Sequence, residues 1–288
     1  MELCKEITNS QVIEGDVFQD DVFIFDQSYN LDLDLFYQVM KGKSCGAILR
    51  NIIPEEICSK ITNNFWRNPG LYKRETDSPA HYVGAFHYGK DLEEYLDESK
   101  DSNQYLHGLF EGTINVFDKI IIALRRMFSE KGINFRVASY KNRSASEFVM
   151  RSWAGTGHYS LHPHEDAAQC EAPNQLGFEI QKAAKNTLIS VNICLKNSPT
   201  EGNLHYWNIM PNSRCRNILG LTYKGSPYPV DSLLNISNQN IPIRIGDIYF
   251  FNGKAIHGVS SSKKINDRRF TISFLMAQLD EETIIYWA

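Results

Sequence analysis

Three residues of the sequence could together bind a metal ion. His164 and Asp166 stand two positions apart, and on an extended chain residues i and i+2 face the same side. His257 follows a strand-like run with a tight Gly246-Asp247 turn, so a distant antiparallel strand can bring its imidazole to the pair. Two imidazoles and one carboxylate suit non-haem Fe(II) with open coordination positions. The residue types and their order therefore predict an iron site.

A His-x-Asp pair alone is weak evidence, because short motifs arise by chance. His162 lies two residues before His164 and could share its strand face. Pro163 between them and the lack of a second carboxylate favour a packing role for His162. The surrounding elements must therefore decide which side chains bind metal.

A cationic side chain that follows the distal histidine could hold a carboxylate. Strand alternation places Arg269, Thr271 and Ser273 on one face and the intervening apolar residues on the other. A guanidinium flanked by hydroxyls is suited to binding a carboxylate bidentately. Arg268 lies on the opposite face and is the alternative anchor if the register shifts by one residue.

Two further arginines are candidates for substrate binding. Arg151 lies on the strand-like run from Phe148 to Trp153, where it could bind a substrate carboxylate inside a barrel mouth. A structural ion pair explains it equally well. Arg74 lies in a predicted loop, and a solvated surface position is the competing interpretation.

Helix-like patterns precede strand-like patterns along the chain. One helix is predicted from Pro54 to about Phe65, and one long amphipathic helix from Leu106 to Phe128, stopped by Gly132. The strand-like runs that follow are 135–139, 148–154, 188–195, 204–209, 241–251 and 270–279. This order predicts an α+β fold in which helices back an antiparallel sandwich or barrel.

We divide the chain into an N-terminal arm (1–45) with one short strand at Val22–Phe25, a helical support region (46–133) and a strand-rich core (134–288). All three are expected to form one structural domain. Of the 288 residues, 42% are hydrophobic and 22% are charged, which is typical of a folded globular protein.

The net charge of −4 provides no basic field for nucleic acid or an anionic membrane, and no apolar run is long enough to span a bilayer. The N-terminal sequence shows no secretory signal, so we expect a cytoplasmic protein with a small-molecule partner. Six scattered cysteines without a Cys-x-x-Cys pair are expected to be reduced thiols.

Across about residues 148 to 279, the sequence resembles the Fe(II)/2-oxoglutarate-dependent dioxygenases. The His-x-Asp pair, the Gly-Asp turn before the distal histidine and the Arg-x-Thr element occur in the family's order. The family's Gly-Gly-Glu turn is altered here to Glu-Gly-Asn at 201–203. The segment from Cys45 to Glu56 is similar to the N-terminal part of the prolyl-hydroxylase-like branch.

This resemblance implies a double-stranded β-helix, or jelly-roll, core that holds Fe(II) and 2-oxoglutarate and uses O2 as cosubstrate. His164, Asp166 and His257 would bind the iron. Arg269 would hold the distal carboxylate of 2-oxoglutarate, with Thr271 as a hydroxyl partner. Family members that halogenate have a small residue at the position of Asp166, so its carboxylate implies hydroxylation.

We expect the protein to hydroxylate an unactivated C–H bond of a free amino acid or related metabolite, while 2-oxoglutarate is decarboxylated to succinate. Two alternatives are a peptide or protein side-chain hydroxylase and a non-catalytic cupin-like binding protein. The substrate, the carbon oxidised, desaturation or cyclisation in place of hydroxylation, and the oligomeric state are open at this stage.

Overall fold

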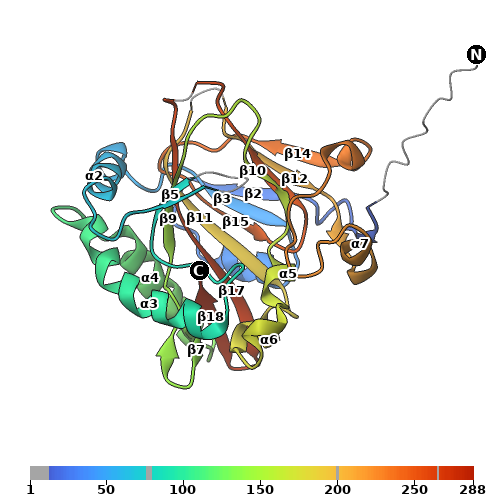
Figure 1. The fold of residues 1–288 in the computed structure, drawn as a ribbon, viewed down its shortest axis with the longest axis horizontal. Helices are drawn as coiled ribbons and strands as arrows, with labels where there is room; N and C mark the ends of the chain where they lie inside the picture. Colours follow the sequence, from blue (N-terminus) through green and yellow to red (C-terminus); the bar gives the residue numbers. More distant parts are fainter. Residues whose placement is uncertain (1–12, 76–79, 199–200, 265) are drawn as a thin grey trace, which may run out of the picture.

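The chain folds around two β-sheets that face each other (Figure 1), in a computed structural model that describes residues 13–75, 80–198, 201–264 and 266–288. The larger sheet has the order β2 (Phe25–Ser28), β3 (Gly46–Leu49), β15 (Ile248–Asn252), β11 (Leu188–Lys196), β17 (Arg269–Asp280), β9 (Val149–Trp153), β5 (Ala80–Val83) and β4 (Tyr72–Arg74). Also in this sheet, β18 (Thr283–Trp287) pairs with β17 and with β6 (Asn134–Val137). The smaller sheet is β10 (Tyr159–His164), β16 (His257–Ser260), β12 (Leu204–Trp207) and β14 (Asn238–Ile241).

The central strand β11 shows how the larger sheet separates core from site. Ile189, Val191 and Ile193 are fully buried in the main apolar cluster beneath the helices. Ser190 and Asn192 alternate with them, and both line the cavity between the sheets. The two-residue period of a strand thus gives the sheet one apolar face for packing and one partly polar face for chemistry.

Helices cover the outer face of the larger sheet (Figure 1). They are α1 (Asp34–Met40), α2 (Glu55–Phe65), α3 (Leu92–Leu106) and α4 (Val116–Glu130). Three short helices lie elsewhere in the chain, α5 (Ala167–Cys170), α6 (Glu179–Ala183) and α7 (Ser213–Ile218), and Cys215 of α7 packs in a separate apolar cluster with Trp207 and Ile256. The 3₁₀ turns are η1 (His107–Phe110), η2 (Pro173–Gln175) and η3 (Val230–Leu233). Two small two-stranded sheets pair β1 (Gly15–Asp16) with the distant β13 (Met210–Pro211), and β7 (Ser139–Tyr140) with β8 (Arg143–Ser144). The longer helices α1 to α4 cover one face of the large sheet, and residues on its other face line the cavity.

The predicted helix over 54–65 is confirmed as α2, but the single long helix from Leu106 to Phe128 is wrong. Gly112 adopts φ +65°, which ends the helical path, and α4 starts afresh after Asn115. The Asn115 side chain accepts a 3.0 Å hydrogen bond from the Asp118 amide and so caps the new helix. The apolar residues keep a helical spacing across this break, so the spacing alone could not reveal where the first helix ends.

The six strand-like runs all contain strands, although 241–251 is split by the turn at Gly246 between β14 and β15. The short strand expected at Val22–Phe25 begins three residues later, as β2. Residues 1–12 of the predicted arm lie outside the described residues. The larger sheet takes β2 from the arm and β3, β4 and β5 from the region expected to be helical, so it crosses both predicted boundaries.

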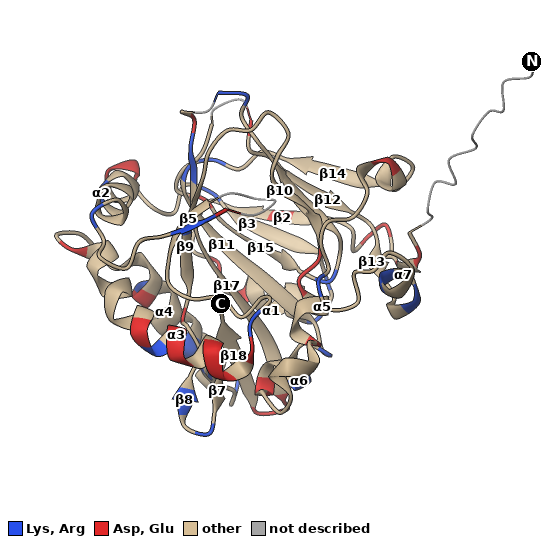
Figure 2. Cartoon of the chain, in the orientation of Figure 1, with Lys and Arg blue, Asp and Glu red and all other residues tan. Residues whose placement is uncertain are grey.

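Acidic side chains are concentrated on α3, whereas Lys and Arg gather near β5 and in the adjacent loops (Figure 2). Five cysteines, Cys45, Cys58, Cys170, Cys194 and Cys215, are buried free thiols, as expected, and Cys4 lies outside the described residues. Within the described ranges, none of the helices has the length and apolar character needed to cross a membrane.

Candidate metal centre and active-site cavity

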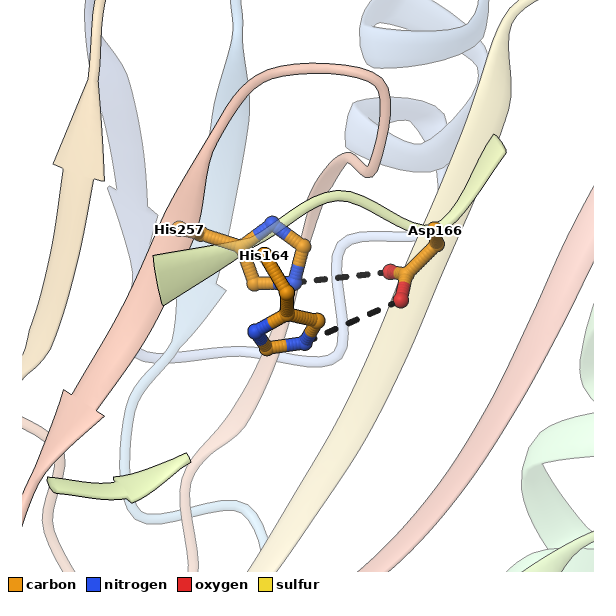
Figure 3. Close-up of side chains that lie close together, drawn as sticks. All are labelled: His164, Asp166 and His257. Carbon is orange, nitrogen blue, oxygen red and sulfur yellow. Dashed lines mark ion pairs between the residues drawn. The ribbon is translucent and has the colours of Figure 1, made fainter. Parts of the chain in front are cut away.

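Two of the three predicted ligands are brought together by strand pairing. His164 is the last residue of β10, and His257 is the first of the antiparallel neighbour β16. The two residues are direct register partners, with ring centroids 4.2 Å apart. Figure 3 shows both imidazoles turned toward the carboxylate of Asp166. The pairing of the small sheet therefore sets the histidine positions.

Backbone carbonyls orient both rings. His164 Nδ1 lies 2.7 Å from the carbonyl oxygen of His162, and His257 Nδ1 lies 2.9 Å from that of Ala255. Each Nδ1–H donates to its carbonyl, which leaves the Nε2 lone pair for a metal. Burial, and secondly the nearby His164, lower the pKa of His257 to about 4, so this imidazole is neutral at pH 7.

Asp166 reaches the histidines through a bend rather than along a strand. β10 ends at His164, and Asp166 has a helical backbone (φ −95°, ψ −12°) at the start of α5. His164 and Asp166 do lie close together, as expected, but not because they share a strand face, since the strand ends before Asp166. Its carboxylate oxygens lie 3.8 Å from His164 Nε2 and 3.4 Å from His257 Nε2. One donor atom from each residue falls within a 4.8 Å cluster, a size that fits one metal ion.

Neighbouring side chains hold the Asp166 carboxylate in place. Ser190 on β11 donates a hydrogen bond to Oδ2, and Gln169 donates one of 3.2 Å to Oδ1. The Asp166 amide also donates to the carbonyl of Gly253, at 2.8 Å. The sequence did not reveal either residue: Gln169 reaches Asp166 from the next turn of the chain, in α5, and only the fold brings Ser190 of β11 against the bend after β10.

The bend itself is fixed by a buried ion pair. Glu165 accepts a 2.6 Å hydrogen bond from the Ala167 amide, and its carboxylate lies 3.0 Å from Arg216 on α7. Burial raises the pKa of Glu165 to about 7, against the opposing effect of Arg216. Since Glu165 is adjacent to both His164 and Asp166, this contact links α7 to the ligand-bearing turn.

Gly253 leaves the space in which the carboxylate sits. A Cβ at this position would collide with Ser190 Oγ and lie 2.9 Å from Asp166 Oδ2. We expect Gly253→Ala to lower metal affinity about 10–100-fold, the usual effect of disturbing groups that orient a ligand. Calorimetric titration with Ni(II) measures this change. Gly108→Ala is the control, because a Cβ there meets only Asn68 Nδ2, at 3.4 Å. Equal affinities in the two variants would contradict the assignment.

Arg269 points into the cavity from β17 with unsatisfied donors. It is 4% exposed, its guanidinium lies 5.3 Å from the Trp153 ring centroid, and Nη2 donates to the Tyr249 hydroxyl. Its Nε and Nη1 have no hydrogen-bond partner among the described residues. A buried guanidinium in this condition requires an acceptor, and a carboxylate can accept from two of its N–H groups at once.

The alternative anchor faces away from the cavity. Arg268 lies over the ring of Trp66 at 5.0 Å and donates to Ser152 Oγ at 3.4 Å. Thr271 is fully buried two residues after Arg269, and it is not among the described residues that line the main cavity. Its hydroxyl lies 3.4 Å from that of Ser273, which does line the cavity.

The main cavity encloses about 680 Å³ of space that is partly open to solvent. It runs from the three clustered ligand residues to Arg269, and its walls come from both sheets. An adjoining cleft shares Phe86, Tyr88 and Arg151 with the cavity and adds Arg74 and Lys224. Arg151 and Arg74, the two arginines predicted to bind substrate, thus line the same cleft as His164 and Asp166.

Phe86 and Tyr88, between β5 and α3, are wall residues that the sequence did not reveal. His87 between them is buried, with Nδ1 3.2 Å from Gln175 Oε1, and burial lowers its pKa to about 4. Gln175 also donates to the His87 carbonyl at 2.7 Å. A single aromatic residue in a loop has no periodic signal, so no sequence pattern could have identified this wall.

The fold and the site together define a non-haem iron oxygenase. The sequence model of the family described as carrier-protein-independent halogenase WelO5 matches residues 27–288. The chain therefore belongs to this family, within the Fe(II)/2-oxoglutarate-dependent oxygenases. This confirms the predicted enzyme class, a 2-oxoglutarate-dependent dioxygenase with Fe(II) as its metal.

Among the proteins similar to the chain are a curated dioxygenase and an enzyme of known structure. An L-isoleucine 3(1)-dioxygenase of Pantoea ananatis (strain AJ13355) is 31% identical over 247 residues, which are 83% of this chain and 82% of the relative. The crystal structure of an N-substituted L-amino acid dioxygenase from Burkholderia ambifaria AMMD aligns with a TM-score of 0.55 at 10% identity, covering 89% of this chain and 91% of that one. The second likeness shows a shared fold.

Proposed function

We propose that the protein hydroxylates an unactivated C–H bond of a free aliphatic amino acid, with L-isoleucine as the first candidate. The observation that carries the proposal is the Asp166 carboxylate beside two imidazoles at the end of a cavity with a buried arginine. The 31% identity to an isoleucine dioxygenase supports the substrate class. Near the ligand residues, the walls include Leu161, Leu204 and Val259, which suit an aliphatic side chain.

In this proposal, His164, Asp166 and His257 hold Fe(II), and the two facing sheets are a double-stranded β-helix. When bound, the iron with 2-oxoglutarate and O2 supplies the oxidation, and 2-oxoglutarate leaves as succinate and CO2. Arg269 binds the distal carboxylate of 2-oxoglutarate through its unpaired donors, and Tyr249 orients the guanidinium. Thr271, two residues after Arg269 on β17, supplies a buried hydroxyl group on the same strand face.

The protein's own groups determine where the reaction takes place. The carbonyls that accept from each Nδ1–H keep both Nε2 atoms directed at one point. The hydrogen bond from Ser190 keeps the Asp166 carboxylate directed at the same point. Apolar walls keep water away from the reacting carbon.

The carboxylate of Asp166 favours hydroxylation over halogenation, although the family model is named for a halogenase. A halide ligand needs the coordination position that a small residue leaves open. Here the bend, Ser190 and Gln169 all direct a carboxylate into that position. We therefore propose an oxygenase within a halogenase-named family, acting as a single catalytic domain in the cytoplasm.

The first experiment is aerobic incubation with Fe(II), ascorbate and 2-oxoglutarate against a panel of free amino acids and short peptides. We expect succinate together with a mass gain of one oxygen on an aliphatic amino acid. Oxygen gain only on peptides would replace this proposal with the peptide hydroxylase. If the iron-loaded protein forms no succinate with any substrate, the non-catalytic binding protein becomes the better explanation.

A further inference from the structure

Arg151 is a half-buried cation in the active-site cleft that lacks an acidic partner. It lies on β9 and lines the cavity, as does Asp166, the carboxylate beside the two histidines. Its guanidinium lies 5.3 Å from the ring centroid of Phe86. Among the residues that the structure describes, no carboxylate forms an ion pair with Arg151, and no side chain or carbonyl forms a hydrogen bond with it.

A second arginine adds positive charge at the same ring. Arg74 lies 5.6 Å from the Phe86 centroid, and Lys90, which forms an ion pair with Glu98, lies 4.0 Å from it. The two acidic residues that line the cleft are Glu165 and Asp166. Glu165 is paired with Arg216 and fully buried, whereas Asp166 faces the histidines. Neither of these two carboxylates therefore forms an ion pair with Arg151.

Holding a guanidinium away from water without a counter-ion is unfavourable, so an unpaired one in a ligand cavity indicates an anionic ligand. Arg269, with its two unpartnered donors, is a second such case in the same cavity. Because Thr271 of β17 is the register partner of Arg151, the two arginines project from neighbouring strands of one sheet. One cavity thus offers two guanidinium groups, each of which can bind a carboxylate.

We propose that Arg151 binds the α-carboxylate of the substrate, and that Arg74, which contacts the same Phe86 ring, adds positive charge to this site. This inference rests on the proposed function and specifies how its substrate is recognised. A guanidinium fork suits a free carboxylate, which internal residues of a peptide lack. Among the described residues that line the cavity and the cleft, the acidic ones are Glu165 and Asp166. Glu165 is paired with Arg216, and Asp166 lies beside the histidines, so recognition depends on the carboxylate end. Carboxamides of the substrate are therefore not accepted.

The test compares Arg151→Gln with the wild type, using Fe(II)-loaded enzyme and L-isoleucine or the amino acid found in the succinate screen. We expect the substrate KM to rise at least about 30-fold, because losing one partner of a desolvated charge pair has effects of this order. The KM for 2-oxoglutarate should stay within about twofold, since Arg269 is intact. Arg126→Gln is the matched control, as Arg126 lies exposed on α4 in a surface ion pair.

Two binding measurements distinguish recognition from folding. For isoleucine, 3-methylpentanoate keeps the carboxylate without the amine and should compete with substrate, whereas L-isoleucinamide should neither compete nor be oxidised. The melting temperature of Arg151→Gln without ligands should equal or exceed that of the wild type, because an unpaired cation is removed. A structural arginine would instead lower it.

The outcomes separate this inference from the proposed function. Wild-type turnover of an amino acid, with an unchanged substrate KM in Arg151→Gln or with equal oxidation of the carboxamide, would overturn the role of Arg151 alone. Failure of the wild type to form succinate with any free amino acid would overturn the proposed function and this inference with it.

Discussion

Replacing Asp166 with alanine is expected to reduce succinate formation below detection and to weaken metal binding by at least about 100-fold. Groups that merely orient a ligand alter metal affinity about 10–100-fold, so removing a ligand itself should reach or exceed that range. The loss also leaves the Ser190 hydroxyl without its acceptor. Ni(II) titration followed by an Fe(II)-dependent succinate assay measures both effects.

The matched control is Asp101→Ala, which removes an exposed carboxylate on α3. This variant should bind metal and turn over like the wild type. If Asp166→Ala kept wild-type metal affinity and turnover, the third ligand would have to come from elsewhere, and the preference for hydroxylation would lose its basis.

Replacing Arg269 with glutamine is expected to weaken 2-oxoglutarate binding by about 2–5 kcal/mol, roughly 30-fold to several thousandfold in Kd. The reason is that a buried guanidinium with two unpaired donors can form charge-assisted hydrogen bonds that an amide cannot replace. Titration of 2-oxoglutarate onto Mn(II)-loaded protein without oxygen measures this directly. Metal affinity in the absence of 2-oxoglutarate should be unchanged.

Arg268→Gln supplies the paired comparison, because it removes the same charge one residue away on the opposite strand face. Its guanidinium packs on Trp66 outside the cavity, so 2-oxoglutarate binding should stay close to wild type. Stronger weakening in Arg268→Gln than in Arg269→Gln would mean that the strand register in solution differs by one residue.

The sequence predicted the metal-site residues because their identities carry the chemistry and their order along the chain is fixed. Strand alternation placed Arg269 and Arg268 on opposite faces and favoured Arg269, with Arg268 left as the alternative, and in the structure Arg269 is the one that lines the cavity. It did not predict how Asp166 is positioned. That depends on the Gly253 carbonyl and on Ser190, which come from strands far away in the sequence.

The long-helix error has a similar physical origin. Apolar spacing reports which face is buried, and this spacing persisted through Gly112, where the backbone turns. The aromatic wall at Phe86 was missed for the opposite reason, since a loop residue is placed by the elements at its ends and not by its own pattern. The helix break and the position of Phe86 thus depend on the path of the backbone, which the residue types alone do not specify.

The distribution of charge over the molecule affects how fast small anions such as 2-oxoglutarate reach the cavity. The protein is net negative, with acidic side chains on α3, yet Arg74, Arg151 and Lys224 surround the opening that leads to the metal site. An approaching dicarboxylate is repelled by one side and drawn to the other once it comes within a Debye length, about 8 Å at physiological ionic strength. Diffusional encounters are thereby steered toward the opening, and added salt slows capture without altering the bound geometry.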